Sequence, residues 1–187
     1  MGLLAGCPII IKPSEVTPLV GRLLADCFSA AELPVWVVQG GGAVGSALID
    51  AKPDKIVFTG GTATGKKVME AASRHLIPVV LELGGKDPMI VDEDANLANA
   101  SSAAVWGCFT NSGQVCASVK RLIVLEKVAD DLTEAVVRKA KALRMGDPTQ
   151  PTTDIGAMTS RMQIDRVEQQ VRAAQQEGAT LAAGGQR

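Results

Sequence analysis

Short apolar runs alternate with segments of helical periodicity through the first half of the chain. The runs predict strands at residues 8–11, 35–38, 55–58 and 79–83, and the periodic segments predict helices at residues 17–33, 45–51 and 64–74. The apolar opening, residues 1–11, is predicted to be a buried strand. Alternation of this kind is typical of parallel β-α-β units. The first half is therefore predicted to be an α/β structure, a parallel sheet flanked by helices.

The second half has a different pattern. Helices are predicted at residues 96–109, 128–143 and 160–177, strands at 121–125 and within 181–185, and loops at 110–114 and 146–156. Because the pattern changes at Gly84-Gly85, we place a domain boundary there, between domains 1–84 and 85–187.

Composition and charge exclude several classes of protein. Of the 187 residues, 47% are hydrophobic, which argues against disorder. The 19 Lys and Arg nearly balance the 20 Asp and Glu, so no nucleic-acid partner is predicted. No apolar run reaches the about 20 residues that a membrane span needs, and no basic residue precedes the apolar opening as in a signal peptide. We expect a cytoplasmic protein without membrane association.

The cysteines show no metal-binding spacing. None of the four forms a C-x-x-C pair, and the single His75 leaves no ligand cluster, so no metal site and a reducing compartment are predicted. Cys7, Cys27 and Cys108 lie in apolar patterns and are predicted to be small buried residues. Cys116 follows a polar, glycine-containing loop that suits a nucleophile, although a buried structural role stays open for it too.

Two glycine-rich segments resemble nucleotide-binding motifs, and each lacks one residue that such a site normally has. Residues 40–45 satisfy G-x-G-x-x-G, but the next strand ends in Thr59 rather than an acidic residue, so a plain tight turn is the alternative. Residues 60–67 nearly spell a phosphate loop, but Lys67 has no hydroxyl for magnesium. Residues 60–67 still predict a site for an anion, because glycines at a helix N-terminus leave backbone N–H groups free to bind one.

Glu82 lies among apolar strand residues. A carboxylate placed there must be paired or protonated, and such a group suits general acid–base chemistry. The alternative is that Glu82 lies at the exposed end of the strand and pairs with Lys86.

Taken together, four segments resemble the aldehyde dehydrogenase superfamily. They are residues 10–15, 58–62, 81–86 and 113–116, in that family's order and approximate spacing, and residues 146–148 and 154–156 also match. The resemblance covers essentially the whole chain. It implies the later part of a Rossmann-like cofactor domain followed by the start of a catalytic domain, as an internal fragment of the longer family pattern.

The resemblance implies the following roles. Cys116 would be the nucleophile that forms a thiohemiacetal and then a thioester with an aldehyde, and Glu82 the base that activates water to release a carboxylic acid. Lys12 and Glu15 would hold the adenosine ribose, and the carboxylate would favour NAD over NADP. The remaining cofactor residues would be Gly60, Gly61 and Thr64 at the pyrophosphate, Gly42 and Gly45 near the adenine, and Leu83 and Gly84 beside the nicotinamide. Gly61 stands where the family more often has serine, and we expect a modest effect.

The family's oxyanion asparagine, a glutamate for the nicotinamide ribose and the oligomerisation strands have no counterpart in these residues. We therefore expect the isolated chain to be inactive and its full-length relatives to be homo-oligomers. Two other hypotheses stay open: a nucleotide-binding module without catalysis, and an interaction protein that retains the fold.

Overall fold

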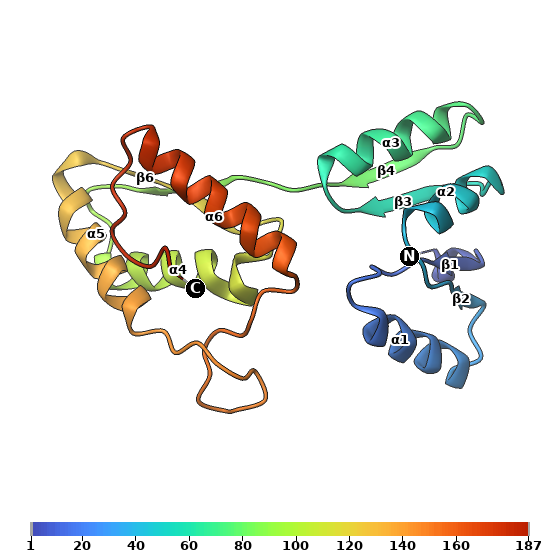
Figure 1. Ribbon diagram of the computed structural model, residues 1–187, viewed down its shortest axis with the longest axis horizontal. Helices are drawn as coiled ribbons and strands as arrows, with labels where there is room; N and C mark the ends of the chain where they lie inside the picture. Colours follow the sequence, from blue (N-terminus) through green and yellow to red (C-terminus); the bar gives the residue numbers. More distant parts are fainter. Residues whose placement is uncertain (1, 187) are drawn as a thin grey trace. The chain divides into compact units, whose positions relative to one another are not determined.

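A computed structural model describes residues 2–186 and divides the chain into two compact units, Met1–Leu83 and Gly84–Arg187 (Figure 1). The strands and their crossover helices are β1 (Ile9–Ile11), α1 (Pro18–Ala30) and β2 (Val35–Val37); β3 (Ile56–Thr59), α3 (Thr62–Ser73) and β4 (Val79–Glu82); and β5 (Asp87–Val91), α4 (Leu97–Phe109) and β6 (Val119–Val124). Within residues 2–186 these strands form three parallel pairs, β1-β2, β3-β4 and β5-β6. The predicted α/β class with parallel strands is confirmed, and the strands pair two by two.

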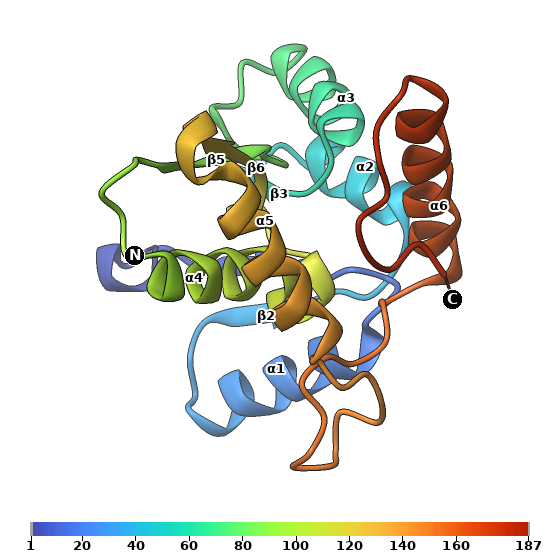
Figure 2. The ribbon, with the colours of Figure 1, turned by 90° about the vertical axis from the view of Figure 1, so that its left-hand side faces the viewer.

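The remaining helices complete each unit. In the first, α2 (Gly42–Asp50) follows β2, and the 3-10 turn η1 (Leu3–Ala5) precedes β1. In the second, α5 (Glu126–Lys141) packs against α4 (Figure 2), and α6 (Arg161–Gln176) comes last. The side chains of Asn96 and Ser160 accept the backbone N–H groups of Asn99 and Gln163, which explains why α4 and α6 begin where they do.

Each crossover covers only one face of its strand pair. Ile49, Ala72 and Ile77 form a buried cluster in the first unit, and Val91, Ala104, Val105 and Leu132 are buried in the second. On the other faces, the register partners Ile10 and Trp36 are 57% and 58% exposed, and Ile90 and Ile123 are 76% and 53% exposed. The prediction of a buried strand at residues 8–11 is therefore wrong, because Ile10 is exposed and Ile9 and Ile11 are only partly buried.

Several element boundaries also correct the sequence predictions. The apolar opening contains the 3-10 turn η1 before β1 begins at Ile9, and α2 begins at Gly42 rather than at residue 45. Strand β5 was not predicted, because Asp87-Pro88 at its start reads as a turn. No strand forms at 181–185, where Gly184 and Gly185 have φ of 72° and 79° and no described strand lies alongside.

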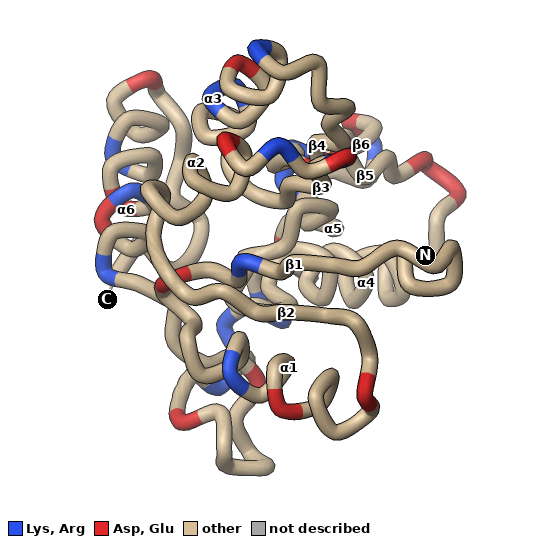
Figure 3. Tube along the Cα trace, turned by 90° about the vertical axis from the view of Figure 1, so that its right-hand side faces the viewer, with Lys and Arg blue, Asp and Glu red and all other residues tan. Residues whose placement is uncertain are grey.

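Charges of both signs are interspersed along the chain trace (Figure 3). This distribution agrees with the near balance of 19 basic and 20 acidic residues. Among the residues that the structure describes, no helix has both the length and the apolarity that crossing a membrane requires.

The loop that follows α5 is closed by an ion pair. Arg144 donates from its backbone N–H, Nε and Nη2 to the Asp154 carboxylate at 2.9, 3.0 and 3.2 Å. The hydrogen bonds from the Arg144 side chain, followed by that from its backbone, hold the pKa of Asp154 below its usual value of 3.8. The pair therefore fixes residue 154 to the end of α5.

This pair predicts a pH-dependent stability. A carboxyl group whose pKa is lowered by folding stabilises the folded state above its unfolded pKa and loses that effect as pH falls through the folded pKa. We expect Asp154→Asn to lower the melting temperature at neutral pH, with the difference from the unsubstituted chain shrinking below the usual value of 3.8. Thermal unfolding as a function of pH measures this, and a difference that persists unchanged in acid would contradict it.

Candidate functional site

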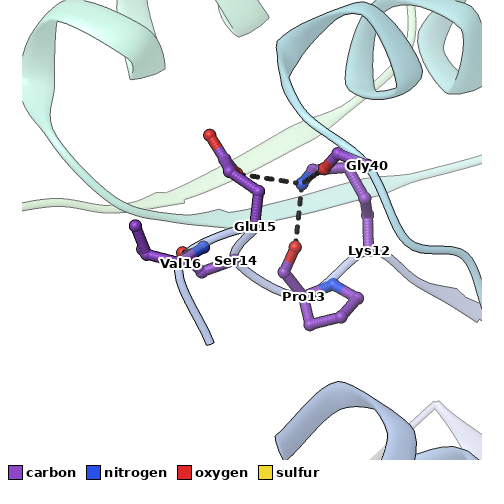
Figure 4. Close-up of polar contacts among 6 residues, drawn as sticks. All are labelled: Lys12, Pro13, Ser14, Glu15, Val16 and Gly40. Atoms are coloured by element: carbon purple, nitrogen blue, oxygen red, sulfur yellow. Dashed lines mark hydrogen bonds and ion pairs between the residues drawn. The ribbon is translucent and has the colours of Figure 1, made fainter. Parts of the chain in front are cut away.

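Lys12 lies at the carboxyl end of β1, directly after Ile11. Its Nζ donates to the carbonyl oxygens of Gly40 at 2.6 Å and Pro13 at 2.8 Å (Figure 4). Its side chain is only 21% exposed. Open α/β sheets bind ligands at the carboxyl ends of their parallel strands, so this cation occupies the edge at which a nucleotide would bind.

Glu15 faces the same ammonium. Its Oε2 lies 3.5 Å from Lys12 Nζ, and its side chain is 61% exposed (Figure 4). Its own backbone N–H, followed by the charge of Lys12, lowers the pKa of the Glu15 carboxyl from its usual value. The carboxylate is thus ionised and accessible, which suits it to accept hydrogen bonds from hydroxyl groups and to repel a phosphate.

The glycines of the first motif differ in what they require. Gly40 has φ +148°, a conformation that favours glycine, and a Cβ there would collide with Val44. A Cβ on Gly45 would lie 3.8 Å from the Lys12 side chain, an ordinary contact, whereas Gly42 faces open space as the first residue of α2. Gly40 was not predicted as a site residue, but it is the position in this turn at which only glycine fits.

Gly60, Gly61 and Thr64 lie where β3 passes into α3. The Gly60 N–H donates to the carbonyl of Glu82 at 3.0 Å, and a Cβ on Gly60 would come 2.6 Å from the Phe58 ring. Gly61 is the N-cap of α3 and has nothing within 4 Å of a built Cβ, and Thr64 lies in the first turn. This helix start has no acidic residue and no side-chain cap, so its free N–H groups are open to an anion.

Leu83 packs against α3. A Cβ on Gly65 would come 2.7 Å from Leu83 Cδ2, so the absence of a side chain at Gly65 lets the helix approach. Gly65, the second glycine of the motif at residues 60–67, is thus explained by the packing of Leu83 against α3, a role that the sequence analysis did not predict.

Glu82 is the last residue of β4 and is exposed. Its register partner is Thr59, and no side-chain hydrogen bond or ion pair joins it to the described part of its own unit. The expectation of a carboxylate enclosed by apolar residues is therefore wrong, because the strand ends at Glu82 instead of continuing past it. Pairing with Lys86, which belongs to the other unit, stays a prediction.

Cys116 is exposed on the turn that follows the 3-10 segment η2 (Thr110–Gly113) and precedes β6. The turn is closed by the Ser118 N–H, which donates to the Val115 carbonyl at 3.2 Å. Ser118 itself is 2% exposed, and its Oγ donates to the Gly107 carbonyl of α4 at 2.9 Å. The thiol is thus accessible while the backbone just after it is anchored in the unit's interior.

Gly85 approaches the same turn from the other side. A Cβ built on Gly85 would lie 2.6 Å from the backbone carbonyl oxygen of Cys116, whereas Gly84 has open space. Arg121 fixes the adjacent peptide, since its Nε and Nη2 donate to the Lys86 carbonyl at 3.0 and 2.7 Å. Of the two glycines, Gly85, which was not predicted as a site residue, is the one that lies close to the backbone of Cys116.

The other cysteines differ from the prediction in part. Cys7 and Cys27 are exposed rather than buried, and for Cys27 the reason is that the apolar face of α1 is uncovered. Cys108 is half-buried, and this burial raises the pKa of its thiol, an effect that the nearby Lys120 partly offsets. Exposure alone therefore does not distinguish Cys116.

The predicted residues fall into separate groups. Lys12, Glu15 and Gly45 lie together beside Gly40, while the second group surrounds the start of α3 and the end of β4. Glu82 and Cys116 belong to different units of the chain. Within residues 2–186, no group of three or more His, Cys, Asp and Glu is arranged to hold a metal ion.

Comparison with known proteins shows the family to which the chain belongs. The sequence model of the "Aldehyde dehydrogenase family" matches residues 1–187. A 4,4'-diapolycopene aldehyde oxidase from Methylomonas sp is 48% identical over 169 residues, which are 89% of this chain and 32% of that protein.

Solved structures agree. Betaine aldehyde dehydrogenase from Staphylococcus aureus, in complex with NAD+, is 32% identical with a TM-score of 0.95 over 99% of this chain and 38% of its own. An NAD-dependent aldehyde dehydrogenase from Sinorhizobium meliloti is 37% identical with a TM-score of 0.93 over 97% of this chain and 37% of its own. The chain spans about a third of the length of these relatives. With a match over every residue and likeness in both sequence and fold, the chain belongs to the aldehyde dehydrogenase family.

Proposed function

We propose that this chain supplies the nucleophile, the general base and part of the NAD site of an enzyme that oxidises an aldehyde to a carboxylic acid. The observation that carries the proposal is the exposed thiol of Cys116 on a turn whose backbone is anchored by Ser118 and approached by Gly85, in a chain matched throughout by the family. Of the four cysteines, it is the one that such a turn presents.

In the proposed reaction, Cys116 Sγ attacks the aldehyde carbon and forms a thiohemiacetal. Cys116 Sγ would hold a thioester once that carbon has lost its hydride and the hydroxyl group its proton to water; bound NAD would supply the hydride acceptor. Glu82 then takes a proton from water as the water attacks the thioester, so that the acid is released and the thiol is restored. The exposed position of Glu82 leaves its carboxylate free to take up that proton.

The proposed NAD site includes Lys12 and Glu15, with Gly42 and Gly45 beside them. Gly60, Gly61 and Thr64 would bind the pyrophosphate through the open N-terminus of α3. Leu83 and Gly84 would lie beside the nicotinamide. Domains 1–84 and 85–187 would then be parts of the cofactor and catalytic domains.

Glu15 predicts the choice of cofactor. Because its ionised carboxylate would repel a 2′-phosphate, we expect Glu15→Gln to raise the affinity for NADP relative to NAD by about tenfold. Calorimetric titration with both cofactors measures the ratio, and Glu32→Gln on the surface after α1 is the matched control. An unchanged ratio would remove Glu15 from the site.

Turnover by the 187 residues alone is the next test. We expect a polypeptide of these residues to reduce NAD with an aldehyde far more slowly than the Sinorhizobium meliloti enzyme, because one face of each strand pair is uncovered. A rate near that of the relative would contradict this.

Magnesium-dependent binding of ATP in place of NAD would favour the second candidate, a nucleotide-binding module that uses residues 60–66.

The relatives are named for different substrates, a diapolycopene aldehyde and betaine aldehyde, so the substrate is proposed only as an aldehyde. A cytoplasmic location and homo-oligomeric assembly of the whole enzyme are proposed on the same family grounds. Measuring the molecular mass of the whole enzyme in solution tests whether it is a homo-oligomer.

A further inference from the structure

The backbone before Cys116 is in an unusual conformation. Asn111, Ser112 and Gly113 have φ of 52°, 56° and 71°, three consecutive residues in the left-handed region. Glycine adopts this conformation freely and asparagine tolerates it, but it is unfavourable for serine. Strained backbone of this kind persists where surrounding contacts determine it.

Gln114 supplies such contacts through both ends of its amide. Its Oε1 accepts the Thr159 N–H at 3.1 Å, and its Nε2 donates to the Asn111 carbonyl at 3.3 Å. The orientation of the amide follows from its partners, since a backbone N–H can only donate and a carbonyl can only accept. One side chain therefore ties the left-handed segment to a residue 45 positions later in the chain.

A second bond joins the same two segments. Ser112 Oγ donates to the Gly156 carbonyl at 2.8 Å. Segment 156–159 lies between Asp154, which is held by Arg144, and Ser160, the N-cap of α6, so it is fixed at both ends. It can therefore act as a firm support for the turn that carries Cys116.

We propose that Gln114 is a positioning residue, which fixes the turn of Cys116 by tying it to Thr159. This proposal rests on the proposed role of Cys116 as nucleophile. A thiol that must attack a carbonyl while backbone N–H groups stabilise the oxyanion needs a fixed turn, whereas simple alkylation does not. Loss of the tie should therefore slow acylation of Cys116 without slowing its alkylation.

Two substitutions of similar size test the tie. Gln114→Glu keeps an acceptor for Thr159 but sets a carboxylate oxygen against the Asn111 carbonyl, and the protonated form of the carboxyl restores a donor. Gln114→Met removes both bonds at every pH. The charged group that lies beside this segment is Lys120, whose Nζ donates to the Gly113 carbonyl at 2.7 Å.

Hydrogen exchange of residues 110–118 in the purified full chain is the first readout. At about pH 7.5 we expect both variants to exchange about tenfold faster than the unsubstituted chain. At about pH 3.5, roughly one unit below the usual pKa of a glutamate, most of the introduced carboxyl is protonated, so Gln114→Glu should recover most of its protection whereas Gln114→Met should not. Gln170→Glu, the same change on the exposed surface of α6, should alter nothing.

Acylation of Cys116 by p-nitrophenyl acetate and alkylation by iodoacetamide, followed on the Cys116 peptide, form the second readout. We expect about tenfold slower acylation in Gln114→Glu at about pH 7.5, with alkylation unchanged. Unchanged exchange, no recovery in acid, or exchange that rises without any effect on acylation would each overturn the proposal. If Cys116 of the unsubstituted chain is not acylated while the exchange pattern appears, the tie stands and the proposed nucleophile fails.

Discussion

Replacing Cys116 with alanine is expected to abolish aldehyde oxidation. The thiol would form the covalent bond to the aldehyde carbon, and no other described group on that turn offers a nucleophile of comparable reactivity. Loss of a nucleophile that acts with a general base costs about 10⁴-fold or more in turnover. Binding of NAD, which the proposal assigns largely to residues 12–64, should be unaffected.

Because the chain spans 37% of the Sinorhizobium meliloti enzyme, turnover is best measured in a chimera of that enzyme in which these 187 residues replace the matching segment. NADH formation is compared between the chimera with and without Cys116→Ala. Cys27→Ala is the matched control, since Cys27 is also an exposed thiol but lies on α1. A Cys116→Ala chimera that keeps a substantial part of the turnover would refute the assigned role.

Much of the fold follows from periodicity. Helices α1, α4, α5 and α6 lie within a few residues of their predicted positions, because α1, α5 and α6 carry an apolar stripe and α4 and α6 begin at an N-cap side chain. The predicted burial is wrong for a physical reason. Apolar residues on a strand indicate a face that can be covered, but whether an element covers it depends on tertiary contacts, as the exposed Trp36 and Ile90 demonstrate.

The sequence predicted those residues of the candidate site whose side-chain chemistry suggests a role. Motifs pointed to Lys12 and Glu15, and the structure places these two side chains in one ion pair. The motifs include Gly40, Gly65 and Gly85 but gave them no role of their own: Gly40 requires a positive φ, and Gly65 and Gly85 allow close approaches from distant segments. A glycine in a sequence indicates freedom of conformation or lack of space, and only the fold distinguishes the two.

Burial at Glu82 illustrates the same limit. The residue follows Val79, Val80 and Leu81, so the pattern suggests a carboxylate inside a strand. The strand in fact ends there, because the bond from Gly60 N–H to the Glu82 carbonyl is the last of the ladder before the neighbouring chain turns from β3 into α3. The end of a strand is set by its neighbour, which the local sequence does not contain.

Gly85→Ala is expected to be the second most damaging substitution. A Cβ at this position would lie 2.6 Å from the Cys116 carbonyl oxygen and 2.7 Å from Asp87 Oδ1. The side chain of Asp87 can rotate away, but the carbonyl is part of the backbone and moves only with the turn. The turn is held by Ser118, and the peptide next to Gly85 is held by Arg121, which donates to the Lys86 carbonyl, so the added methyl group must displace one anchored segment or the other.

A displacement of about 1 Å in a reacting group costs roughly 10²-fold in rate, and we expect a fall of that size in turnover of the same chimera. Alkylation of Cys116 and the affinity for NAD should change little, because the thiol stays exposed and the residues at Lys12 are untouched. Gly41→Ala, where a Cβ meets nothing within 4 Å, is the control for loss of a glycine as such. If Gly85→Ala turns over normally, the close approach of Gly85 does not position the nucleophile. If alkylation falls as steeply as turnover, the methyl group has covered the thiol rather than moved it out of line.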